Sequence, residues 1–245
     1  MRMLKALRSL GPIDMKNVVR DPMLRWLTFY PIMISIFMRW GLPVFTGFLM
    51  DKYSFDLIPY YPLLLSMVIF LTPLLTGMII GFLLLDQRDD QTLSALQITP
   101  LMLTGYMIYR ITTPMLLSII LTLIIIPVIG LVEIGFLPLL FTALVAAPLA
   151  VEYALFLAAF AANKVQGFAI AKALGVLNIA PFAAWFVSSW WQIGLGLVPL
   201  YWPAKVFWLG IENNSQIWIY GLTGLAYQFL LIWALLRRYT SALQR

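Results

Sequence analysis

Residues 60–85 read YYPLLLSMVIFLTPLLTGMIIGFLLL and contain no charged side chain, and residues 86–100 follow as DQRDDQTLSALQITP. A helix rises 1.5 Å per residue, so about 20 apolar residues cross the roughly 30 Å hydrocarbon core of a bilayer. The apolar run is therefore long enough to span a membrane. The charges that follow it predict the point at which the chain leaves the membrane.

Five further apolar runs lie on either side of this one. They cover residues 26–50, 104–129, 136–161, 173–191 and 217–236. The 245-residue chain is 62% hydrophobic and 11% charged, whereas soluble domains carry about 25% charged residues. The sequence therefore predicts an all-α, polytopic membrane protein, a single transmembrane domain of six helices over residues 1–245. The charge-free stretch continues from the fifth run to Ala204 and leaves room for a re-entrant or interfacial helix.

Lysine and arginine gather on one side of the predicted spans. Residues 1–25 alone carry six of the 16, and loops rich in these residues stay in the cytoplasm. Both termini are therefore expected in the cytoplasm. The net charge of +6 reflects this bias, and no basic surface for nucleic acid is expected.

Residues 1–25 are expected to form a cytoplasmic amphipathic segment. Leu4, Leu7 and Leu10 share one helical face, and basic residues occupy the other, where they would meet anionic membrane lipids. A plain topogenic tail is the alternative. Asp21 followed by Pro22 predicts a helix N-cap that opens the first span.

The chain has neither histidine nor cysteine. Zinc sites built from those residues, Ser-His-Asp triads and thiolate chemistry are therefore excluded. No Gly-Lys dipeptide occurs, so the phosphate-binding loop of common ATPases is missing as well. We expect no catalytic or metal site, no cofactor bound by this chain and no ATP hydrolysis by the chain itself.

Three charges fall inside the predicted spans, at Arg39, Arg110 and Glu152. A charge in mid-membrane costs ~2.5–3.5 kcal/mol on insertion scales, so it needs a partner or water. Because consecutive spans usually neighbour each other, we expect Glu152 to pair with Arg110, with Arg39 as the rival partner. This pair is expected to hold helices together, and a role in substrate binding is the alternative. Gly77 and Gly81 in the second span predict a close contact with another helix.

Residues 86–103 form the connection between the second and third spans. Asp89 or Asp90 can cap a short helix, Leu93 and Leu96 fall on one of its faces, and Pro100 ends it. This short amphipathic helix is either a connector at the membrane surface or a lever by which a partner moves two spans together.

The segment resembles the signature of type-2 ATP-binding cassette (ABC) exporter permeases, in which G-T-L-x-x-L-x-x-[ST]-P precedes a basic residue by about ten positions. The matching residues are Thr92, Leu93, Leu96, Thr99 and Pro100, with Gln91 in place of the glycine and Arg110 as the basic residue. The six spans and the basic N-terminal segment also fit this family. So does VPLYWP at residues 198–203, a region that in this family forms short outer-side helices before the last span. The start of the chain, from Arg20 to Trp40, is similar to permeases for fluoroquinolone export.

The resemblance implies a permease subunit in a prokaryotic plasma (inner) membrane. A separate ATP-binding cassette ATPase would bind ATP and magnesium. A second permease, identical or a sibling chain, would complete the pathway for a hydrophobic or amphipathic substrate such as a drug or a lipid-like molecule. The resemblance also implies that Arg39 lines this pathway, because the first span faces the dimer seam in the family.

The same resemblance implies where the ATPase would dock. Polar contacts would come from Asp86, Arg88, Asp89 and Asp90, and the docking helix from Thr92, Leu93, Leu96, Thr99 and Pro100. Residues 163–172 form either a smaller contact or only a basic turn. A secondary transporter or channel, or a membrane scaffold without transport activity, is the alternative function.

Overall fold

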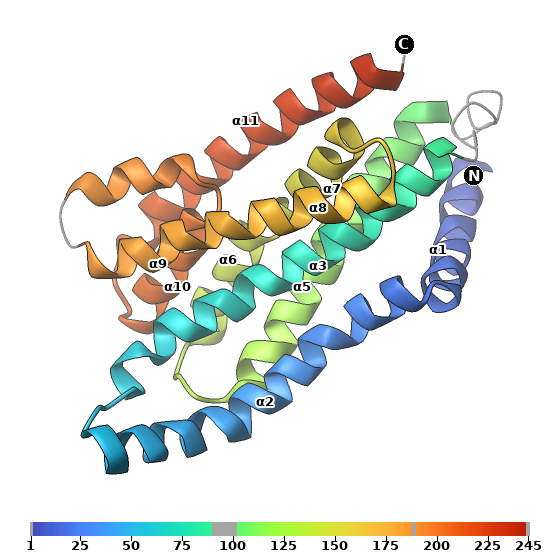
Figure 1. Ribbon diagram of the computed structural model, residues 1–245. Coiled ribbons are helices and arrows are strands. Elements are labelled where there is room, and N and C mark those ends of the chain that lie inside the picture. The colour runs from blue at the N-terminus through green and yellow to red at the C-terminus, as the bar shows by residue number, and fades with distance from the viewer. Residues whose placement is uncertain (1, 90–101, 188–189, 244–245) are drawn as a thin grey trace.

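The computed structural model describes residues 2–89, 102–187 and 190–243. Within these ranges every regular element is a helix (Figure 1), and six helical segments are long and apolar enough to cross a membrane. They are Pro22–Tyr53, Ile58–Arg88, Gly105–Ile129, Phe136–Phe160, Lys164–Phe186 and Ile217–Tyr239. The prediction of an all-α protein with six spans is confirmed.

Four of the six spans contain one long helix. These helices are α2 (Pro22–Tyr53), α3 (Tyr61–Asp89, preceded by the 3-10 turn η1, Ile58–Tyr60), α5 (Met102–Ile129) and α11 (Ile217–Leu243). Helix α1 (Arg2–Arg20) precedes them. The predicted N-cap of α2 is confirmed, because Asp21 accepts hydrogen bonds from the backbone N–H groups of Met23 (2.9 Å) and Leu24 (3.3 Å). The amphipathic character of the N-terminal segment stays a prediction.

The other two spans are interrupted. The fourth consists of α6 (Phe136–Ala146) and α7 (Pro148–Phe160), and the break falls at Pro148, which lacks the N–H that continues a helix. The fifth consists of α8 (Lys164–Leu174), the 3-10 turn η2 (Gly175–Asn178) and α9 (Ile179–Phe186). This span begins at Lys164 rather than at residue 173, and it ends at Phe186 rather than at residue 191. The earlier start is capped by Asn163, whose side chain accepts a hydrogen bond from the backbone N–H of Gln166 at 3.0 Å.

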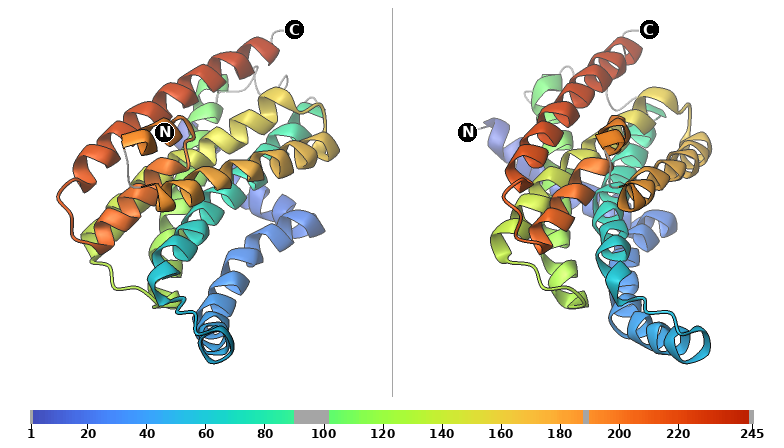
Figure 2. Two further views of the ribbon diagram at one scale, coloured as in Figure 1. Left: turned by 60° about the vertical axis from the view of Figure 1, so that its left-hand side comes forward. Right: turned by 90° about the vertical axis from the view of Figure 1, so that its left-hand side faces the viewer.

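Helices α3, α6 and α7 occupy the centre of the bundle. They form the second span (α3) and the fourth span (α6 and α7). Over the 18-residue apolar window of each span, 83% and 78% of the positions are buried, against 17% to 28% in the other four spans. Helices α2 and α11 lie on opposite sides of the centre (Figures 1 and 2). Most positions in the windows of the four outer spans are therefore at least partly exposed, as expected for a chain surrounded by lipid or by a second subunit.

The contact between α3 and α7 depends on two glycines. A Cβ atom at Gly77 would lie 2.4 Å from the carbonyl oxygen of Ala150, and one at Gly81 would lie 3.0 Å from the side chain of Leu157. A larger residue at Gly77 would push the two backbones apart. The predicted close contact is confirmed, and its partner is the helix that carries Glu152.

Between the fifth and sixth spans the chain folds back into the bundle. After the 3-10 segment η3 (Trp190–Leu197), helix α10 (Tyr201–Ile211) is buried over most of its length and packs against α3, α6 and α11. Two buried indole groups are paired: Trp202 donates to the carbonyl of Gly196 at 3.0 Å, and Trp208 to that of Pro62 at 3.3 Å. A further short helix in this part of the chain agrees with the sequence-based expectation.

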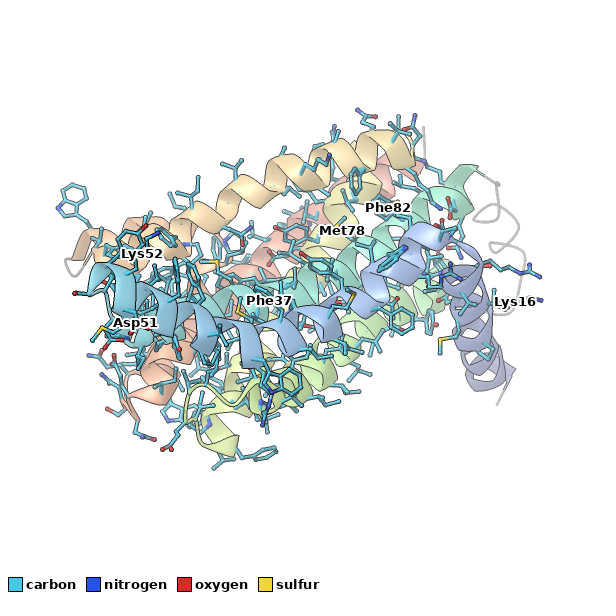
Figure 3. The ribbon with its side chains drawn as sticks, turned by 60° about the horizontal axis from the view of Figure 1, so that its bottom comes forward. Lys16, Phe37, Asp51, Lys52, Met78 and Phe82 are labelled. Atoms are coloured by element: carbon cyan, nitrogen blue, oxygen red, sulfur yellow. The ribbon has the colours of Figure 1, made fainter. Side chains whose placement is uncertain are left out.

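The bundle has two ends, which we name after the short helices that they carry. At the α1 end lie α1, the C-terminal ends of α3, α7 and α11, and the N-terminal ends of α2, α5 and α8 (Figures 1 and 2). The opposite end is the α10 end. Figure 3 shows α2 along the outside of the bundle, with Phe37 near its middle and Asp51 and Lys52 at the end far from α1.

Candidate functional site

A two-point ion pair joins α1 to α5 at the α1 end. The Nη1 and Nη2 atoms of Arg110 lie 2.7 Å and 3.0 Å from the two carboxylate oxygens of Asp14. Both residues are buried, with 3% of Arg110 and 7% of Asp14 exposed. A planar contact of this kind fixes the orientation of both partners. It also makes each partner necessary, since removal of one leaves a buried charge unpaired.

Tyrosine hydroxyl groups surround this pair. Tyr109 donates a hydrogen bond to Asp14 at 2.9 Å, and the Nε of Arg110 donates to the hydroxyl of Tyr106 at 2.8 Å. The Tyr106 hydroxyl donates in turn to the side chain of Gln87 on α3. Buried polar groups therefore connect α1, α5 and α3 in one continuous network.

A second ion-pair cluster lies at the start of α8. The ammonium of Lys164 is 2.7 Å from Asp21, which caps α2, and 2.8 Å from Asp86, in the last turns of α3. One cation thus joins three helices. Burial opposes the ionisation of Asp21, but hydrogen bonds from Lys164, Leu24 and Met23 outweigh it and hold the pKa of this carboxyl below its usual value.

Arg88 fastens the end of α3 to the end of α7. Its Nη2 atom donates to the backbone carbonyls of Ala161 (2.9 Å) and Ala162 (2.7 Å), and its Nη1 atom donates to that of Ala158 (3.4 Å). The last carbonyls of a helix lack intrahelical donors, and a cation there also interacts favourably with the helix dipole. The contact therefore satisfies polar groups at the end of α7 and ties α7 to α3.

Together these contacts form what we call the charged junction. Its members are Asp14, Asp21, Asp86, Arg88, Arg110 and Lys164. Along the chain, Asp86 and Arg88 precede the connection between α3, which ends at Asp89, and α5, which begins at Met102, and Arg110 follows it. Side chains on both flanks of that connection hold α1, α2, α7 and α8, so a displacement of the connection would be passed to four further helices.

The structure describes part of the predicted docking site. Asp86 and Arg88 belong to the charged junction, and Asp89 is the last residue of α3. The remaining predicted docking residues are Asp90, Thr92, Leu93, Leu96, Thr99 and Pro100. These residues, and the short helix predicted to carry them, lie outside the described residues, so the predicted contact with an ATPase stays a prediction.

The predicted ion pair between Glu152 and Arg110 is wrong. Arg110 pairs with Asp14, and the rival partner Arg39 donates to the backbone carbonyl of Val128. Glu152 is 6% exposed, and its Oε1 has no hydrogen-bond partner within the described part of the chain. The long Arg110 side chain reaches past its own span to a carboxylate on α1.

Arg39 lies on the exposed side of α2. Val128, its hydrogen-bond partner, is in the last turn of α5, so Arg39 satisfies one of the carbonyls that this helix end leaves open. Its predicted place along a substrate pathway is not tested by this contact and stays a prediction.

Sequence reasoning missed Asp14, Asp21 and Lys164 as members of the charged junction. A signal for two of them is present, because Asp14 and Asp21 are the only acidic residues among the first 50, in a segment dominated by basic ones. A single carboxylate in such a segment suggests an ion pair with a cation from another part of the chain. The local sequence pattern does not identify that cation.

Six apolar spans, with charges gathered in ion pairs at one end, define a multi-pass membrane protein. Comparison with known families makes the assignment more specific. The chain belongs to the family described as Rv2686c-like, fluoroquinolones export permease protein, which it matches over residues 14–236. The match includes the whole charged junction and Glu152.

Curated relatives support the same assignment. The chain is 36% identical over 240 residues to the fluoroquinolones export permease protein MT2760 of Mycobacterium tuberculosis (strain CDC 1551 / Oshkosh). It is equally similar to the fluoroquinolones export permease protein Rv2686c of M. tuberculosis (strain ATCC 25618 / H37Rv). Each alignment covers 97% of this chain and 95% of the relative. No solved structure matches the chain.

Proposed function

We propose that the chain is the transmembrane permease subunit of an ABC exporter. It moves a hydrophobic or amphipathic substrate, in the manner that its relatives' names give for fluoroquinolones, out of the cytoplasm or the inner leaflet. A separate ATPase subunit, which binds ATP and magnesium, supplies the energy. Export is supported by the names of the relatives, and the ATPase by the resemblance of residues 91–100 to the permease signature.

The charged junction is the observation that carries this proposal. The ATPase binds the α3–α5 connection, and closure of the ATPase on binding ATP displaces that connection. Arg110 passes the motion to α1, Lys164 passes it to α2 and α8, and Arg88 passes it to α7. A loop whose flanking helices contacted no other helix would be a poor lever, whereas α3 and α5 are linked through these side chains to α1, α2, α7 and α8.

The α1 end is assigned to the cytoplasm of a prokaryotic cell. Arg20, Arg25, Arg88, Arg237 and Arg238 all belong to helix segments at this end. The positive-inside bias supports this orientation. It places the α3–α5 connection on the side where ATP and the ATPase are found, with the basic α1 against the lipid headgroups.

The outer face of α2 supports pairing with a second permease, identical or a sibling. Phe37, Trp40 and Val44 are 67%, 62% and 74% exposed on this helix. Arg39 lies among them, and a guanidinium facing hydrocarbon is unfavourable. A second permease against α2 would cover the apolar side chains and place Arg39 at a seam or a water-filled pathway.

Affinity purification of the tagged chain in mild detergent, followed by mass spectrometry, tests the proposal. We expect a P-loop ATPase to accompany the wild-type chain in stoichiometric amount, because the docking segment is intact. Leu93→Asp should abolish this association, since it places a charge on the apolar face of the docking helix. Ile58→Asp is the matched control: Ile58 is 58% exposed at the α10 end, so its replacement should leave the ATPase bound.

The result distinguishes the alternatives. Association that survives Leu93→Asp contradicts the docking assignment. A monodisperse wild-type preparation without any ATPase contradicts the ABC assignment and favours a secondary transporter or a scaffold. A second six-span chain in the sample identifies a sibling permease.

A further inference from the structure

A cavity beside Glu152 lies outside the charged junction. It has a volume of about 240 Å³ and is bounded by α7, the α8–η2 segment, the end of η3 and α11. Leucine side chains make up most of its wall, together with Phe156 and Tyr227. The Tyr227 hydroxyl donates to the carbonyl of Leu197, which ties the end of η3 to α11 at the cavity.

Two polar groups in this apolar wall lack partners. Glu152 is 6% exposed and Tyr153 is 4% exposed, and both residues line the cavity. Neither Oε1 of Glu152 nor the Tyr153 hydroxyl has a hydrogen-bond partner within the described residues. Buried polar groups in folded proteins are normally paired, so two adjacent exceptions at one cavity need an explanation.

The two cations expected from the sequence as partners of Glu152 do not fill this role. Arg110 is held by Asp14, and Arg39 by a backbone carbonyl at the end of α5. A second cavity, between α2 and α3, is lined by Met23, Trp26, Leu27, Tyr30, Leu75 and Met78 and has no acidic side chain in its wall. A carboxyl oxygen without a hydrogen-bond partner is therefore a feature of the cavity at Glu152 that this second cavity does not share.

We propose that this cavity binds the protonated amine of an amphipathic ligand, with Glu152 as its ion-pair partner. The Tyr153 hydroxyl contributes a hydrogen bond, and the leucine walls bury the aromatic or aliphatic group next to the amine. Whole drug-sized ligands occupy pockets of roughly 300–1,000 Å³, so a cavity of about 240 Å³ takes the amine-bearing part of a larger molecule. The identification of that molecule with the transported substrate rests on the proposed function, whereas the binding itself requires no ATPase.

Two fluorinated probes of nearly equal shape test the proposal. In 1-(4-fluorophenyl)piperazine the distal nitrogen is protonated at neutral pH, and in 4-(4-fluorophenyl)morpholine an oxygen replaces it and the molecule is uncharged. Each is titrated by fluorine NMR into the full chain in lipid nanodiscs, with empty nanodiscs correcting for partition into lipid. We expect the piperazine to bind about tenfold or more tightly than the morpholine, as for a buried charge-assisted hydrogen bond.

Variants identify the site. Glu152→Gln keeps the shape of the side chain and removes its charge, so it should weaken the piperazine about tenfold and leave the morpholine within about twofold. Glu133→Gln is the matched control, because Glu133 is an exposed residue that does not line this cavity, and it should bind both probes as the wild type does. Leu231→Trp fills the cavity and should abolish the binding of both probes.

Equal affinities of the two probes, an unchanged piperazine affinity in Glu152→Gln, or the absence of saturable binding would each overturn the proposal. Its failure is separate from that of the proposed function. A chain that carries its ATPase but does not discriminate the probes refutes only the cavity assignment. A chain that discriminates them without any ATPase refutes only the ABC assignment.

Discussion

Arg110 and Glu152 are two buried charged residues in the same bundle, with opposite surroundings. Arg110 has the carboxylate of Asp14 on α1 around its guanidinium, together with the Tyr106 hydroxyl and the rings of Tyr106 and Tyr109 on its own helix. Glu152 lies against an apolar cavity with an unpartnered oxygen. Burial alone therefore does not distinguish the roles of two charged residues inside the membrane, whereas their partners do. A charged residue that pairs within the chain stabilises the fold, and one without such a partner is free to bind a group from outside the chain.

The largest expected effect follows from breaking the satisfied pair. Arg110→Met leaves Asp14 buried without its cation and removes the ion pair between α1 and α5, so that the Tyr109 hydroxyl is the remaining hydrogen-bond donor from α5 to Asp14. Loss of one partner of a buried ion pair typically lowers stability by about 3–5 kcal/mol. We expect a loss of this size in the free energy of unfolding, measured by steric trapping in bicelles.

A double variant shows whether the effect comes from the unpaired charge. Asp14→Leu combined with Arg110→Met removes both charges and should recover most of the lost stability. Arg25→Met, at an exposed position of α2, is the matched control and should change stability by less than about 0.5 kcal/mol. A double variant no more stable than Arg110→Met alone would mean that the pair is not the source of the effect.

A smaller effect is expected at the partly exposed pair of the junction. Side chains of Lys164 and Asp21 are 30% and 26% exposed, so Lys164→Met should cost about 1 kcal/mol or less at neutral pH. Because the folded state holds the pKa of Asp21 below its unfolded value, this stabilisation is present above the unfolded pKa. It is lost as pH falls through the folded pKa.

Melting temperatures across the acidic range check this dependence. The difference between wild type and Lys164→Met should shrink as the pH is lowered through the titration of Asp21. Lys172→Met, an exposed lysine further along α8, serves as the control and should show no such convergence. A constant difference down to strongly acid pH argues against ionised Asp21 as the source.

The spans could be predicted from sequence because a bilayer requires long apolar helices wherever the chain crosses it. The close contact at Gly77 and Gly81 was also predictable, since it depends on local backbone geometry. The early start of the fifth span could not be predicted, because the charged Lys164 was assigned to a loop. Its charge is satisfied by Asp21, a residue 143 positions away.

The candidate site was predictable only in its local part. Asp86 and Arg88 were identified from their own segment, but the partner of Arg110 lies 96 positions away. The rule that consecutive spans are neighbours led to Glu152, and α5 and α7 are indeed in contact. Contact between helices does not fix where a long side chain points. Arg110 turns toward the α1 end because a carboxylate is present there, which no periodic pattern records.

The smallest effect on stability is expected at the open charge. Glu152→Gln removes a charge that no described residue compensates, so the folded state loses no ion pair and gains an uncharged group that is less unfavourable to bury. We expect the free energy of unfolding to stay within about 0.5 kcal/mol of the wild type or to rise slightly, by the same steric-trapping measurement. A loss comparable to that of Arg110→Met would mean that Glu152 has a partner in the assembled protein, such as a basic residue of a second permease. Unchanged stability combined with weakened amine binding would instead separate the two buried charges by function, one holding the helices together and the other receiving a ligand.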